Sequence, residues 1–323
     1  MKNVTTIAAS VLAVLATSGA AQDDELESVS LRLPWILNVQ AAGYVMALDQ
    51  GYYEDAGLDV EILPGGPNLN STALVATGSN TFGTHDISGL LLGAAQGMDI
   101  VMVGACFQDH PGGVITLASK GIETPNDLVG QRLAYNEGGP WVLVQAMLAR
   151  EGVSLDDIEL VVSPSTELLI NRNVDAKTGF TVNEPIAVEL AGIETNVILP
   201  SNFGVNTNAE VIFTTRDFME QNPDTVQGFV DATVRGYAYA YEHPDETVEA
   251  VLKMNDQLEP EQQAEQLRRQ ESYVFNEFTR ENGPCAFDTG VVADTMAVLK
   301  EFTDFDADLD PDSLYSTEFV PTK

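Results

Sequence analysis

The chain has 323 residues, 44% of them hydrophobic, and a formal net charge of −34 at pH 7. This length is comfortable for two domains, each with a full-sized hydrophobic core. The charge excludes nucleic acid as a partner, because neutralising phosphates requires Lys and Arg, and it disfavours binding to an anionic membrane surface.

Residues 1–21 have the pattern of a secretory signal peptide. Lys2 supplies the positive end, residues 7–15 the apolar core and residues 18–21 the small side chains for cleavage. The apolar run is too short to span a bilayer. We therefore expect cleavage after about Ala21 and an exported protein, with a buried N-terminal helix as the alternative.

The stretch from 31 to 63 predicts a strand, a helix at 41–50 and a second strand, which together form a βαβ unit. Trp35, Asn38 and Gln40 follow the first strand. Ligands of open α/β sheets bind beyond the carboxyl ends of the strands, so we expect Trp35 to stack on a ligand and the two amides to contact it. The alternatives are a hydrophobic lid for Trp35 and helix capping for the amides.

The next strands are predicted at 81–84 and 99–106. His85 and Asp86 stand at the carboxyl end of the first of them and are candidate ligand contacts, although His85 can equally form structural hydrogen bonds. The segment FQDHPGG then breaks the pattern. Phe107 and Gln108, which begin it, either line the floor of a cleft or fix a hinge.

A second α/β unit follows, with strands predicted at 133–135, 158–162 and 178–182. Asn136 and Gly138 stand at the head of a helix beginning at Pro140. Free N–H groups there can cradle an anion, although Glu137 would repel one. Trp141 can face Trp35 across a cleft, with core packing as the alternative.

Asn183 and Glu184 follow the strand predicted at 178–182. A carboxylate at position 184 can accept two N–H bonds from an amino-heterocycle. The alternative is a helix-terminal Glu that is stabilised only by the helix dipole.

A returning strand at 211–214 and a helical C-terminal part complete the chain. We predict an α/β fold with lobe 1 at 28–107 and 206–323 and lobe 2 at 108–205, joined by a hinge around a central cleft. The two cysteines, Cys106 and Cys285, can form a disulfide only if their Cα atoms come close together, which the sequence leaves open.

Three segments carry a family resemblance: WILNVQAAGYVMALDQGYYEDAGLDVEILPGG, ETPNDLVGQRLAY and NVDAKTGFTVNEPI. They resemble the SsuA/THI5-like (NMT1-like) solute-binding proteins of ABC importers. The resemblance implies a type II periplasmic binding protein, with two parallel-type sheets flanked by helices. It further implies a protein that works in the periplasm and delivers a small molecule to a membrane permease. We also expect a monomer. Glu184 matches a position that looks like the ligand-holding carboxylate of the pyrimidine-binding branch.

Two ligand classes stay open. A flat nitrogen heterocycle, such as a thiamine pyrimidine precursor, suits Trp35, Trp141 and Glu184. It also suits the acidic charge, unless that charge only reflects adaptation to a salty medium. An alkanesulfonate, taurine or nitrate would be expected to bind beside an Arg or Lys, and none stands at the predicted strand ends.

An enzyme of the THI5 type is a further alternative. The pyrimidine synthases of that group carry a cysteine-rich CCCFC loop, whereas this chain has HPGGVITL in the corresponding region. The three histidines lack metal-ligand spacing. We therefore predict a binding protein with no catalytic residue, cofactor or metal.

Overall fold

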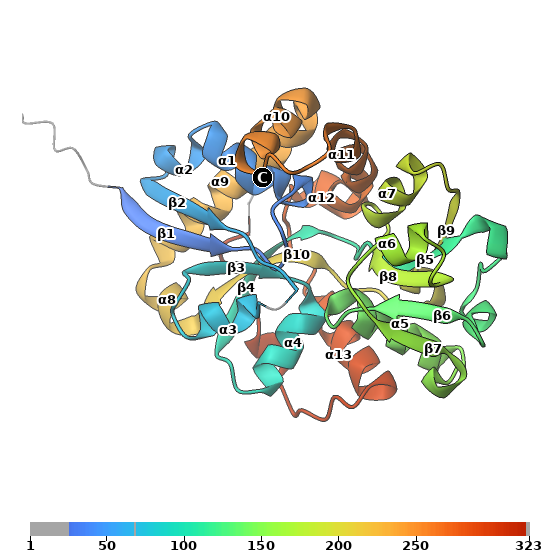
Figure 1. Ribbon diagram of the computed structural model, residues 1–323. Coiled ribbons are helices and arrows are strands. Elements are labelled where there is room, and N and C mark those ends of the chain that lie inside the picture. The colour runs from blue at the N-terminus through green and yellow to red at the C-terminus, as the bar shows by residue number, and fades with distance from the viewer. Residues whose placement is uncertain (1–25, 68, 321–323) are drawn as a thin grey trace, which may run out of the picture.

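The computed structural model describes residues 26–67 and 69–320 and contains two five-stranded sheets that lie in separate lobes (Figure 1). The predicted two-lobed α/β fold is confirmed. The predicted signal peptide at 1–21 lies outside the described residues. No helix among the described residues is long and apolar enough to cross a membrane.

The first sheet has the order β2-β1-β3-β10-β4. Strands β1, β2 and β3 run parallel, whereas β10 is antiparallel to both β3 and β4. The sheet is therefore mixed. Its reversed strand, β10, is the one that the chain forms on its return from the other lobe. Its strands are β1 (Glu27–Arg32), β2 (Leu58–Leu63), β3 (Phe82–His85), β4 (Ile100–Phe107) and β10 (Ala209–Thr215).

Helices cover both faces of this sheet. Along β4, Val101 and Val103 belong to one hydrophobic core, and Ile100 and Met102 belong to another, as the alternation of side chains in a strand requires. Helices α1, α2, α9, α10 and α11 contribute to the first core and α3, α4 and α13 to the second. The helices of this lobe and of the C-terminal part are α1 (Ala42–Asp49), α2 (Tyr52–Asp55), α3 (Ser71–Ala76), α4 (Ile87–Ala95), α8 (Arg216–Gln221), α9 (Pro223–Glu242), α10 (Pro244–Met254), α11 (Pro260–Val274), α12 (Glu277–Asn282) and α13 (Gly290–Phe302).

The second sheet has the order β7-β6-β8-β5-β9, and in it β5 is the reversed strand. Helix α5 packs on one face, against a core that includes Val114 and Leu133. Helices α6 and α7 pack on the other, against Ile115 and Ala134. The elements of this lobe are β5 (Gly112–Leu117), β6 (Arg132–Tyr135), α5 (Gly139–Arg150), β7 (Glu159–Val162), α6 (Glu167–Ile170), β8 (Ala176–Phe180), α7 (Glu184–Leu190) and β9 (Thr195–Ile198).

The chain crosses between the sheets twice, after β4 and before β10, and hydrogen bonds tie the two crossings together. Nδ2 of Asn208 donates to the carbonyl of Phe107 at 3.2 Å and to that of Gln108 at 2.8 Å. Next to them, Cys106 and Cys285 form a disulfide, which answers the question that the sequence left open. These contacts make the crossings a compact hinge.

The two lobes also meet along two edges (Figure 1). On one edge, Nη2 of Arg269 on α11 lies 2.7 Å from Oε2 of Glu189 on α7. On the other, α13 packs on both lobes, because Leu299 lies in the second core of lobe 1 and Phe302 packs on the core of lobe 2. The predicted boundaries, with 206–323 assigned wholly to lobe 1, stay a prediction.

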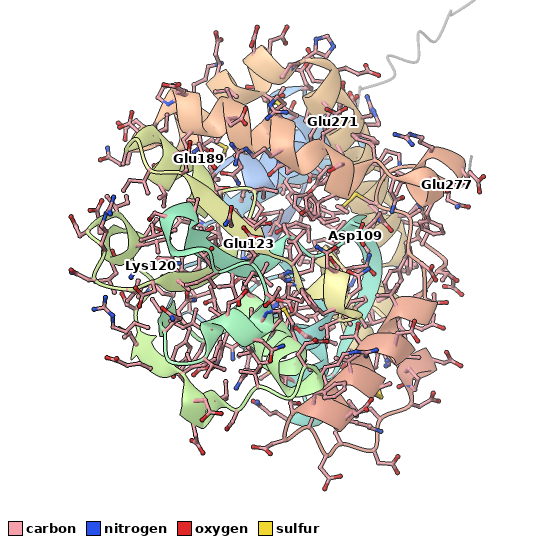
Figure 2. The ribbon with its side chains drawn as sticks, turned by 90° about the vertical axis from the view of Figure 1, so that its right-hand side faces the viewer. Asp109, Lys120, Glu123, Glu189, Glu271 and Glu277 are labelled. Carbon is pink, nitrogen blue, oxygen red and sulfur yellow. A yellow bond between two sulfur atoms is a disulfide. The ribbon has the colours of Figure 1, made fainter. Side chains whose placement is uncertain are left out.

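Figure 2 shows the lobe 2 side of the molecule, with carboxylate tips along much of its outline. Asp109, Glu123 and Glu189 lie on this side together with Lys120. Carboxylates on the surface are the arrangement that keeps a highly charged protein soluble in salt.

Candidate functional site

A cavity of about 510 Å³ lies between the two lobes. It is bordered by the segments that follow β1, β3, β6 and β8, and by the start of β10. This is the position expected for a ligand site, beyond the carboxyl ends of the strands.

The structure brings eight of the twelve predicted site residues together in the lining of this cavity. They are Trp35, Gln40, His85, Asp86, Asn136, Gly138, Asn183 and Glu184. The first four come from lobe 1 and the other four from lobe 2, so a ligand in the cavity would touch both sheets. Their roles as ligand contacts stay predictions.

The other four predicted residues do not line the cavity. Asn38 caps a short 3₁₀ helix, since its Oδ1 accepts from the N–H of Gln40 at 2.8 Å. Phe107 is buried in the lobe 1 core. Gln108 is buried in the hinge, where its Nε2 donates to the carbonyl of Ala286 at 3.0 Å.

Trp141 is 4% exposed, and its ring stacks on Tyr135 at 4.2 Å between centroids. The expectation that it faces Trp35 is therefore corrected in favour of core packing. The aromatic side chain of lobe 2 that lines the cavity is Phe180, at the end of β8. The sequence prediction missed it because the strand predicted at 178–182 lies two residues earlier, at Ala176–Phe180.

Glu210 also lines the cavity and was not predicted. Its φ of 48° lies in the left-handed region, and its side chain is 3% exposed. Nε2 of Gln40 donates to its Oε1 at 2.5 Å. Burial raises the pKa of Glu210 to about 7, against the opposing hydrogen bond from Gln40. A buried carboxyl group on a strained backbone next to a cavity is typical of a functional site.

Glu184 combines a structural contact with its place at the cavity. Its Oε2 accepts from the N–H of Phe180 at 2.9 Å, and Oε1 lies 3.6 Å from Nζ of the buried Lys177. The side chain is nevertheless 20% exposed and lines the cavity. It therefore fixes the end of β8 and still faces the place where a ligand would lie.

His85, Asp86 and His110 form a titratable cluster beside the cavity. Burial alone lowers the pKa of His85, but the carboxylate of Asp86, 3.0 Å away, outweighs this effect and raises that pKa. Burial alone raises the pKa of Asp86, but His85 and hydrogen bonds lower it below its usual range. Burial lowers the pKa of His110 to about 4.

Acidic side chains outnumber basic ones in the lining, where His85 is the one titratable base among the described residues. Among the described residues that line the cavity, four are acidic and none is Lys or Arg; the acidic ones are Asp86, Glu137, Glu184 and Glu210. Partly exposed aromatic rings face the cavity from both lobes, Trp35 from one and Phe180 from the other. Such a lining suits a flat neutral or cationic molecule and opposes an anion. No group of three or more His, Cys, Asp or Glu side chains suited to a metal occurs in the described part of the chain.

Comparison with known proteins gives related sequences, of which two are named as binding proteins for small molecules and one as a synthase. The riboflavin-binding protein RibY of Chloroflexus aurantiacus is 28% identical over 92% of this chain and 87% of its own length. The formylaminopyrimidine-binding protein of Halalkalibacterium halodurans is 26% identical over 76% of each chain. A third relative, from Legionella pneumophila, is named 4-amino-5-hydroxymethyl-2-methylpyrimidine phosphate synthase and is 25% identical over 71% of this chain and 74% of its own.

Among solved structures, the periplasmic aliphatic sulphonate-binding protein SsuA of Escherichia coli has the same fold. The TM-score is 0.71 at 15% identity, over 92% of this chain and 94% of that one. The sequence profile described as NMT1/THI5 like matches residues 38–247, more than half of the chain. The chain therefore belongs to the NMT1/THI5-like family.

Proposed function

We propose that this protein is the solute-binding component of an ABC importer. It acts in the periplasm as a monomer, captures a flat nitrogen heterocycle in the interlobe cavity and delivers it to a membrane permease. The observation that carries the proposal is the lining, which combines an aromatic ring from each lobe with four carboxyl groups and, among its described residues, no Lys or Arg. The names of the riboflavin-binding and formylaminopyrimidine-binding relatives support the same ligand class.

Each part of the lining has a task in this proposal. Trp35 and Phe180 stack on the faces of the ring. Glu184, when ionised, accepts N–H bonds from an exocyclic amino group. Glu210, when protonated, offers both a donor and an acceptor to the ring edge. A pyrimidine or flavin edge presents the matching acceptors and donors.

A pyrimidine synthase is the second candidate, because a relative carries that name. The two candidates differ in what happens to the ligand. A binding protein returns its pyrimidine unchanged after long incubation, and a synthase yields a product that mass spectrometry detects.

The first test uses the two tryptophans of the chain. Trp35 lines the cavity, whereas Trp141 is buried against Tyr135. We expect a bound pyrimidine or flavin to quench the fluorescence of the wild type and of Trp141→Phe, and to leave that of Trp35→Phe nearly unchanged. Quenching of Trp35→Phe with wild-type amplitude and affinity would remove Trp35 from the site.

A separate thermal-shift screen tests the ligand class. A ligand that binds only the folded state at 100 times its Kd adds about 2.7 kcal/mol of stability. We expect pyrimidines or flavins to raise the melting temperature. A rise caused only by alkanesulfonates, taurine or nitrate contradicts the proposal.

Glu184→Gln should weaken binding of the heterocycle by at least about 1.5 kcal/mol, roughly tenfold, because a charge-assisted hydrogen bond is lost. The Gln side chain can still accept from the N–H of Phe180, but Lys177 loses its ionic neighbour. Affinity is therefore measured by calorimetry together with the free energy of unfolding. Glu137→Gln, an exposed position of the same lining, is the matched control. Unchanged affinity in a folded Glu184→Gln protein removes Glu184 from the site.

A further inference from the structure

Asp86 belongs to lobe 1, where it forms the N-cap of α4. Its Oδ1 accepts from the N–H of Gly89 at 2.8 Å and from the hydroxyl of Ser88. The residue is 8% exposed and still borders the cavity. The other oxygen, Oδ2, lies 3.0 Å from Nδ1 of His85, which also accepts from the backbone N–H of Asp86 at 2.9 Å. The carboxylate is thus held in a fixed position at the boundary between the lobes.

Across that boundary, the carboxylate meets the first residue of α5 in lobe 2. A Cβ atom on Gly139 would overlap the carboxylate of Asp86, so only glycine allows this close approach. Gly138, just before it, has a φ of 137°. The head of this 12-residue helix therefore presents bare backbone to Asp86. In this first turn Pro140 has no N–H, and the N–H groups of Trp141 and Val142 donate to the carbonyl of Gly138. What the carboxylate meets is therefore chiefly the partial positive charge of a helix N-terminus, which attracts small anions.

His110, in the hinge, faces the same carboxylate. It is 4% exposed, and its Nδ1 accepts from the N–H of Gly112 at 2.8 Å. A neutral His110 therefore carries its proton on Nε2, which lies 4.0 Å from Oδ2 of Asp86. Nε2 has no hydrogen-bond partner among the described residues. The unpartnered Nε2 of the hinge residue His110 and the head of α5 therefore both lie beside the carboxylate of Asp86.

We infer that Asp86 is a specificity-determining residue, which fills the anion position at the head of α5 and so excludes sulfonates, nitrate and phosphate from the cavity. The inference rests on the proposed role of this cavity as the ligand site. It adds a physical reason why a fold shared with a sulphonate-binding protein would reject that ligand here. The protein supplies its own carboxylate where a ligand anion would otherwise bind.

The test measures the affinity of methanesulfonate, taurine, nitrate and inorganic phosphate for three proteins, at one fixed ionic strength. Asp86→Ser removes the carboxylate and keeps a hydroxyl that can cap α4. We expect it to bind at least one of these anions at least about tenfold more tightly than the wild type, since a repelling charge is lost and a helix terminus is freed.

Glu137→Gln is the matched control, because it removes one negative charge from an exposed side chain next to the head of α5 and leaves the buried carboxylate of Asp86 in place. We expect it to change anion affinity less than about threefold, as for a solvent-screened charge. An equal gain in anion affinity in both variants means that the net charge of the lining sets this affinity, and this overturns the inference.

A folded Asp86→Ser protein without any gain in anion affinity also overturns it. Should that variant not fold, Asp86→Asn keeps the size and the cap, and a gain below about threefold has the same meaning. The outcome is separable from the proposed function. If the wild type binds a heterocycle but neither Asp86 variant gains anion affinity, only the inference fails. If an Asp86 variant gains anion affinity but the wild type binds no heterocycle, only the proposed function fails.

Discussion

The wild-type protein should lose about 2 to 4 kcal/mol of unfolding free energy, relative to Glu210→Gln, as the pH rises through the range in which Glu210 ionises. Burial raises the pKa of this carboxyl from 4.5 to about 7. Well below pH 4.5 the group is neutral in both the folded and the unfolded chain. Above that value the unfolded chain releases the proton first, so the folded state loses stability until its own carboxyl ionises near pH 7.

Urea denaturation at a series of pH values checks this expectation. The groups that act on Glu210 from neighbouring elements are Gln40, Thr84, His85 and Asp86. All four are present in both proteins, so their effects cancel to first order in the difference. The acidic end of the series is the internal control, since both side chains are then neutral and differ only in packing. A difference between the two proteins that stays constant from acid to neutral pH contradicts a buried, protonated Glu210.

Removing the disulfide should have an effect of similar or greater size. The Cys106→Ala/Cys285→Ala variant should unfold with about 3 to 5 kcal/mol less free energy than the wild type. The bond links residues 179 positions apart, and the chain-entropy relation gives about 5 kcal/mol for a loop of that length. Chemical denaturation of both proteins under oxidising conditions measures the difference.

The same bond also anchors the hinge. The N–H of Ala105 donates to the carbonyl of Cys285 at 3.1 Å, and Gln108 reaches the carbonyl of Ala286 at 3.0 Å. Dithiothreitol is the control, since it should destabilise the wild type and leave the double variant unchanged. A double variant within about 1 kcal/mol of the wild type would show that folded-state packing, rather than the cross-link, holds this segment.

The sequence predicted the residues whose position depends on local chain order. Trp35, His85 and Glu184 line the cavity because they follow strands, and the carboxyl ends of parallel strands meet at one edge of a sheet. The burial of Trp141 could also be predicted from the sequence. It lies at helical spacing with Val144 and Leu148, and all three are buried, which indicates a core-facing stripe.

The place of Glu210 in the cavity could not be predicted from the sequence, because it depends on strand pairing between distant parts of the chain. It stands at the start of β10, which pairs with β3 and β4, strands more than 100 residues earlier in the chain. Only that long-range pairing brings its carboxyl to Gln40 and buries it. An isolated Glu before an apolar strand gives no such signal, because the same pattern occurs at any solvent-exposed strand end.

The two edges at which the lobes meet differ in what separation would expose. At the edge of α13, Leu299 and Phe302 pack on different lobes, and parting them would bring apolar surface into water at about 25 cal/mol per Å². At the edge of α7 and α11, the contacts are polar, with Arg269 on Glu189 and Gln262 on Asn183, and water can replace them at little cost. Separation of the lobes should therefore cost less free energy at the edge of α7 and α11 than at the edge of α13. For a fluorescent biosensor made from this protein, a pair of labels on α7 and α11 would span the edge whose contacts separate at the smaller cost in free energy.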